Sequence, residues 1–112
     1  MADSEIKFTK PKKVGIIRIG GVPITIKTAD TIVVKNGKED ECWGVAHWPT
    51  ATVAVSRALS KENREVVLLH EMIHIISSMH GLGLNEQQVD RLSLALNEME
   101  YGSKWRKLVH GN

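Results

Sequence analysis

Two histidines and a glutamate at helical spacing are the residues of this chain best suited to chemistry. His70, Glu71 and His74 form a His-Glu-x-x-His pattern. Residues four apart lie one above the other on a helix face, so both imidazoles can reach one metal ion at about 2.0–2.1 Å, the usual zinc–nitrogen distance. Glu71 lies about 100° around the helix from His70, where it can reach a water molecule at the metal without being a ligand. The pattern indicates a zinc peptidase site with Glu71 as general base.

The sequence around these three residues is strongly apolar over residues 66–76. A buried histidine or glutamate is costly unless it is paired or bound to a metal. The alternative is an amphipathic helix with two hydrogen-bonded histidines and an exposed glutamate. The polar stripe of such a helix would be unusually narrow, so the apolar setting favours a metal site.

A catalytic zinc site usually has three protein ligands and leaves one position for water. Glu86, His80 and Asp90 are the candidates for the third ligand. Glu86 opens a second predicted helix after a tight turn, and Asp90 lies four residues further on the same face, where it could instead accept a hydrogen bond from a ligating histidine. His80 has the spacing of a metzincin ligand, but Ser77 stands where that pattern needs glycine. In a continuous helix His80 lies about 240° from His74 and points away from the metal.

The overall composition is typical of a globular protein. The chain has 112 residues, of which 42% are hydrophobic and 25% charged, and its formal net charge is +2. We expect a single domain over residues 1–112. The charge is too small to indicate nucleic-acid binding, and no apolar run is long enough to predict a membrane span. Cys42 is the only cysteine, and residues 1–5 lack the apolar core of a secretory signal, which favours a cytoplasmic location.

The patterns along the chain predict an α+β fold. We expect a small, twisted, mostly antiparallel sheet of three or four strands, packed on a helical hairpin that carries the histidines. Residues 1–12 are expected to be a loose N-terminal arm, residues 38–41 a charged loop and residues 103–112 a C-terminal tail. Strands are expected at residues 14–19, 22–27, 31–35 and 52–56.

The ends of both helices have clear signals. Ser60 is a typical N-cap for the first helix, and Gly81 is expected to end it. Asn85 and Gln88 form a capping-box pair at the start of the second helix. That helix should place four apolar residues at helical spacing against the core, namely Val89, Leu92, Leu96 and Met99.

The stretch Asn85-Glu86-Gln87-Gln88-Val89-Asp90 resembles the second motif of the gluzincins, Asn-Glu-x-x-Ser-Asp, with Val89 in place of serine. The resemblance implies that Glu86 ligates zinc and that Asp90 orients a zinc-bound histidine. The same stretch is similar to the Glu-x-x-Ala-Asn/Asp-x-Phe-Ala segment of ImmA/IrrE-type metallopeptidases of phages and mobile elements. The likeness covers about residues 43–100 and implies a zincin-like fold.

The sequence therefore predicts a metallopeptidase that holds one Zn²⁺ per chain and hydrolyses a peptide or protein substrate. Glu71 would take a proton from water and deliver it to the leaving amine. Tyr101, His80 and His47 are candidates for stabilising the oxyanion. The strand Thr52, Val53, Ala54, Val55 is expected to be a sheet edge that pairs with the extended substrate. The alternative is a catalytically silent, metal-bound protein-interaction module, which could be phage-encoded.

Overall fold

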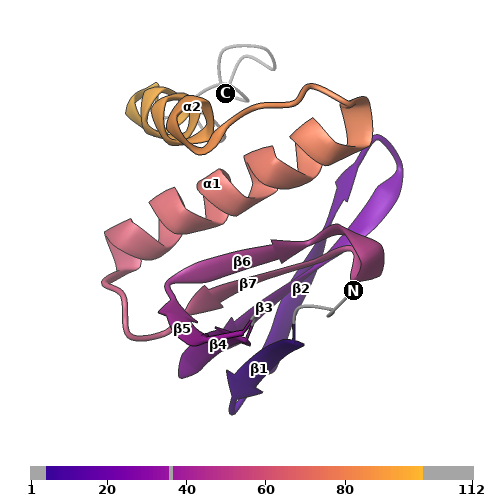
Figure 1. Cartoon of the computed structure of the whole chain (residues 1–112). Coiled ribbons are helices and arrows are strands. Elements are labelled where there is room, and N and C mark those ends of the chain that lie inside the picture. Colours follow the sequence, from indigo (N-terminus) through magenta and orange to yellow (C-terminus); the bar gives the residue numbers. More distant parts are fainter. Residues whose placement is uncertain (1–4, 36, 100–112) are drawn as a thin grey trace.

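Two β-sheets and two α-helices make up the fold in the computed structural model, which describes residues 5–35 and 37–99 (Figure 1). The three-stranded sheet has the order β1-β4-β5 and is antiparallel. The four-stranded sheet has the order β2-β3-β7-β6, in which β3 and β7 run parallel and the other two pairs antiparallel. The elements are β1 (Glu5–Thr9), β2 (Lys12–Ile19), β3 (Val22–Ala29), β4 (Thr31–Lys35), β5 (Glu39–Cys42), β6 (Gly44–His47), the 3₁₀ helix η1 (Trp48–Thr50), β7 (Thr52–Ser56), α1 (Lys61–His80) and α2 (Glu86–Glu98).

The prediction of a mostly antiparallel α+β fold is confirmed, but the strands form two sheets rather than one. Alternation of side chains along β3 explains how they stack. Ile24 and Ile26 are buried against α1, whereas Ala29 packs toward the three-stranded sheet with Ile32 and Ala54. Since successive strand residues point to opposite faces, the four-stranded sheet buries apolar residues on both faces.

Helix α1 lies between the four-stranded sheet and α2 (Figure 1). Met72 and Ile75 face the sheet, while Leu69 and Ile73 face Val89 of α2. Contact on two sides explains why residues 66–76 are apolar almost all around the helix. Both predicted ends of α1 are confirmed by an N-cap at Ser60 and a left-handed C-cap glycine, Gly81, at φ 61°.

Helix α2 begins as predicted, with a reciprocal capping box between Asn85 and Gln88. The predicted apolar stripe is wrong in part. Val89 is fully buried and Leu96 is half-buried, but Leu92 is 43% and Met99 53% exposed. The small Ser93 is buried instead and donates a hydrogen bond to the Asp90 carbonyl, so the face toward α1 turns through residues 89, 93 and 96.

Two segments expected to be irregular are strands. Residues 5–9 of the expected loose arm form β1, because Ile6 and Phe8 alternate with charged residues and pack against the core between the sheets. The expected charged loop forms most of β5, an exposed strand at the edge of the three-stranded sheet. The expected C-terminal tail, residues 103–112, lies outside the described residues.

The prediction that Thr52–Val55 forms a sheet edge is wrong. These residues belong to β7, which lies inside the four-stranded sheet between β3 and β6. The edge strands are β2 and β6. Strand β6 pairs antiparallel with β7 from Gly44 to His47 and lies beside α1 (Figure 1). Pro49 does not interrupt this strand because it falls in η1, after β6 has ended.

Candidate metal centre

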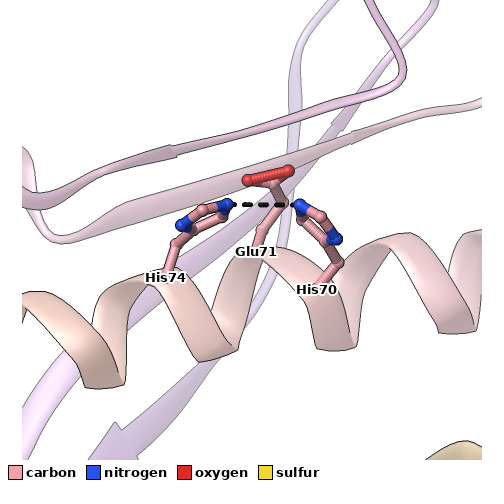
Figure 2. Close-up of side chains that lie close together, drawn as sticks. All are labelled: His70, Glu71 and His74. Atoms are coloured by element: carbon pink, nitrogen blue, oxygen red, sulfur yellow. Dashed lines mark hydrogen bonds between the residues drawn. The ribbon is translucent and has the colours of Figure 1, made fainter. Parts of the chain in front are cut away.

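His70 and His74 present their imidazole rings to each other on one side of α1. Their Nε2 atoms are 3.2 Å apart and the ring centroids 4.9 Å apart. Figure 2 shows the carboxylate of Glu71 beside the gap between these nitrogens. Ligand atoms of the three residues lie within 4.8 Å of one another, a spacing that could hold a metal ion. The local helix geometry predicted from the sequence is therefore present.

Glu86 reaches both histidines from the second helix. Its Oε2 lies 3.2 Å from His70 Nε2 and its Oε1 lies 2.7 Å from His74 Nε2. The chain reverses between the helices through Gly81 and Gly83, both at positive φ, and the packing of Val89 on Leu69 and Ile73 holds α2 in place. The tertiary fold thus brings a carboxylate to the point where the two imidazoles converge.

Asp90 sets the orientation of the first histidine. Its Oδ1 lies 2.8 Å from His70 Nδ1, on the opposite side of the ring from Glu86. When Nδ1–H donates to this carboxylate, Nε2 of the neutral ring carries a lone pair. A carboxylate in this position is the usual partner of a metal-ligating histidine, because it fixes the ring and its tautomer.

Two of the three separations between these donor atoms match those around a tetrahedral zinc ion, whereas the third, His74 Nε2 to Glu86 Oε1, is shorter at 2.7 Å. Ligand atoms about 2.0–2.1 Å from zinc at tetrahedral angles lie about 3.3 Å from one another. Two of the separations, His70 Nε2 to His74 Nε2 and His70 Nε2 to Glu86 Oε2, are both 3.2 Å. With Nδ1–H directed to Asp90, His70 Nε2 and the Glu86 carboxylate are both acceptors, so a cation or a proton between them is needed to make their approach favourable.

Glu71 is buried between α1 and β6 and is placed differently from Glu86. Burial raises the pKa of Glu71 to about 7; the nearby His70 opposes this increase and the Glu86 carboxylate adds to it. A divalent cation beside the carboxylate would favour its ionised form, which accepts protons. Glu86, by contrast, is exposed and has two oxygens within 3.2 Å of the imidazole nitrogens.

Gly44 allows β6 to approach the helix at this point. A Cβ on Gly44 would lie 2.5 Å from Val67 Cγ1 and 3.2 Å from Glu71 Cγ. Real Cβ atoms do not come as close as the first of these distances, so with any larger residue either the Val67 side chain or β6 would have to move. The glycine therefore lets β6 lie this close to Glu71.

A cleft of about 400 Å³ opens over these groups between β6 and the helices. Sequence reasoning missed six of its lining residues, namely Gly44, Val45, Ala46, Trp48, Ile75 and Ser78. Ser78 could have been found, since it continues the four-residue spacing of His70 and His74. The cleft is lined by Gly44, Val45, Ala46, Trp48, His70, Glu71, His74, Ile75, Ser78 and Glu86.

The three candidates for the oxyanion partner are not brought to this cleft by the described part of the chain. His80 is exposed in the last turn of α1, as expected from its angle around the helix, and does not line the cleft. His47 does not line the cleft either. It follows Val45 at strand alternation, lines a second pocket with Ile6 and Phe8, and its Nδ1 lies 2.8 Å from Thr50 Oγ1. Tyr101 lies outside the described residues.

Asp90→Asn is expected to weaken zinc binding by about 10- to 100-fold, the usual effect of losing a hydrogen-bond partner of a ligating histidine. The neutral amide holds the His70 ring less firmly and makes it a weaker ligand. Asp90 is exposed on α2, so the variant should fold normally. Competition with a chromophoric zinc chelator measures the affinity, with Asp40→Asn on β5 as control. Equal affinity in both variants would contradict the assigned role.

Comparisons of the chain with protein-family models, curated proteins and solved structures found no match. Within residues 5–35 and 37–99, no helix combines the length and apolar character needed to cross a membrane.

Proposed function

We propose that this chain is a small zinc metallopeptidase with a gluzincin-like set of ligands. The observation that carries the proposal is the meeting of His70 Nε2, His74 Nε2 and the Glu86 carboxylate, with Asp90 behind His70. Three ligands leave a fourth position for water or substrate, which is the arrangement of catalytic rather than structural zinc. The cleft beside this point leaves room for a substrate.

In the proposed mechanism, His70, His74 and Glu86 bind the metal, and Glu71 transfers protons. These three ligands would hold a zinc ion, which would supply a Lewis acid for the scissile carbonyl and for water. Glu71 accepts the proton of the attacking water and returns it to the amine that leaves. A buried carboxylate with a near-neutral pKa in the absence of metal suits a group that must both take up and release a proton.

Strand β6 is the part of the fold that would hold an extended peptide in the cleft. It is one of the two edge strands of the four-stranded sheet, the other being β2, and three of its residues line the cleft with Glu71 and the histidines. A peptide can add to such an edge through main-chain hydrogen bonds. This mode of binding places a backbone carbonyl next to the proposed metal, and we propose β6 in place of β7 as the strand that binds substrate.

Metal analysis tests the proposal first. Purified protein is expected to contain about one zinc per chain, and removing the metal should abolish peptide cleavage. A ligand about 100-fold above its Kd stabilises the native state by about 2.7 kcal/mol, which for a chain of this length is about 10 °C in Tm. Elemental analysis and a thermal melt with and without chelator measure both effects.

The effect of metal removal should be reversible. Zinc added back after chelation should restore Tm and cleavage together, whereas Mg²⁺, which prefers oxygen ligands, should restore neither. Protein that contains no zinc, and whose Tm does not respond to zinc or chelator, would refute the metal site.

The composition of the cleft also favours a second function, a catalytically silent metal-bound module that binds proteins. Among the described residues that line the cleft, none is a tyrosine, arginine or lysine that could stabilise an oxyanion. Such a module would bind one zinc and a peptide without cleaving it. Mass spectrometry of a diverse peptide mixture, incubated with the zinc-loaded protein, distinguishes the two: new termini support the peptidase, and intact peptides support the module.

A further inference from the structure

The residues of β6 that face α1 increase in size along the strand. Gly44, Ala46 and Trp48 occupy alternate positions: Gly44 meets Glu71, Ala46 packs against the cluster that contains Met72 and Ile75, and Trp48 lines the cleft in the first residue of η1. The small side chains of Gly44 and Ala46 leave space between β6 and the proposed metal. The indole then forms a high wall at one end of the cleft.

Backbone interactions hold Trp48 in this position. Its carbonyl accepts a hydrogen bond from Ala51 N at 2.9 Å, and Ala51 adopts a left-handed conformation at φ 49° that closes the turn. Pro49 restricts the backbone in between. The Thr50 hydroxyl binds the side chain of His47 at 2.8 Å on the other face of the strand. These contacts restrict the backbone at Trp48, the residue from which the indole projects.

The cleft that Trp48 borders is also lined by one buried apolar residue and one exposed serine of α1, Ile75 and Ser78. Trp48 itself is 38% exposed. An aromatic ring that borders a cleft loses water-exposed area when a large apolar side chain fills the space.

Strand β6 and helix α1 run in the same direction past the proposed metal. Gly44 lies against Val67 and Glu71, and Trp48 shares the cleft with Ile75 and Ser78. Antiparallel pairs are slightly more stable than parallel ones, so a peptide added to β6 would run antiparallel to it. Its residues near Trp48 are then on the N-terminal side of the bond beside the metal.

We propose that Trp48, Ile75 and Ser78 form a subsite that selects a large apolar side chain on the N-terminal side of the cleaved bond. The subsite rests on the proposed peptidase function and specifies its substrate class: extended peptides with an aromatic or large aliphatic residue one or two positions before the bond. Strand residues rise by about 3.4 Å each, which sets this distance from the metal.

Two peptides that differ only in phenylalanine or alanine at this position test the proposal. The wild-type protein is expected to prefer the phenylalanine peptide by about 10- to 100-fold in kcat/KM, the range for filling a hydrophobic pocket. Trp48→Ala should remove most of this preference because the wall is lost. Ser78→Phe should also remove it, by filling the subsite from an exposed helix position. Trp43→Ala is the matched control, since Trp43 is 57% exposed and does not line the cleft.

Equilibrium binding separates this proposal from the peptidase function. The Glu71→Gln protein should bind the phenylalanine peptide more tightly than the alanine peptide, and adding Trp48→Ala should bring the two affinities together. If Trp48→Ala and Ser78→Phe both keep the wild-type preference in cleavage and binding, the subsite is refuted while the peptidase stands. If the wild-type protein cleaves neither peptide, the peptidase function fails, and the binding comparison alone decides whether Trp48 selects the side chain.

Discussion

Replacing Glu71 with glutamine is expected to lower kcat/KM for peptide cleavage by about 10²- to 10⁴-fold, the contribution of a positioned general base. The amide cannot accept the proton of the attacking water. Because Glu71 is buried where charge is disfavoured, a neutral side chain of the same shape should preserve the fold. Zinc content and Tm should therefore match the wild-type protein, and peptide turnover with metal analysis measures both.

Glu65→Gln is the matched control for this variant. Glu65 is on the same helix but is exposed and does not line the cleft, so its replacement should leave activity unchanged. Equal turnover in the wild-type and Glu71→Gln proteins would exclude Glu71 as the base. Loss of zinc from Glu71→Gln would instead indicate that its carboxylate is a ligand, in keeping with its place near both histidines.

Replacing Glu86 with glutamine is expected to weaken zinc binding by more than the roughly 10- to 100-fold loss assigned to a hydrogen-bond partner of a ligand. The variant removes the charged oxygen ligand that converges with the two imidazoles. The Glu86 side chain is 74% exposed, so the change should have little effect on packing. Competitive chelation measures the affinity, and cleavage should fall with zinc occupancy.

Two variants make this result specific. Glu98→Gln removes another exposed carboxylate, at the far end of α2, and should not affect zinc binding. His80→Ala tests the competing ligand and should also have no effect, because His80 lies outside the cleft. If Glu86→Gln binds zinc as tightly as the wild-type protein and His80→Ala binds it more weakly, the third ligand is His80 and not Glu86.

The predictions that depend on helices agree with the structure because their signals are local. Caps at Ser60 and Asn85, the end at Gly81 and the common face of His70 and His74 all follow from residues within one or two turns. The predicted inward stripe of α2 failed at Leu92 and Met99. Periodicity identifies an apolar face, but the helix that packs on it determines its centre, and α1 meets α2 at Ser93.

The strands show a different limit. Residues 5–9 and 39–42 carry many charges and read as loops, yet they pair with β4. Gly44–His47 is short and is followed closely by a proline, so its sequence gave little indication that it forms β6, the strand that pairs with β7. Strand order depends on pairing between residues far apart in the chain, which no local pattern encodes.

The sequence alone determined the pair of imidazoles one turn apart, the glutamate between them and the helix ends that frame them, since these follow from backbone geometry over a few residues. The gluzincin resemblance implied roles for Glu86 and Asp90, but only the tertiary structure brought both carboxylates to His70, made β6 rather than β7 the edge strand beside α1, and placed Trp48 in the lining of the cleft. Those relations arise where separate elements pack together, and the close approach of β6 to α1 at Gly44 exists only once that packing has formed.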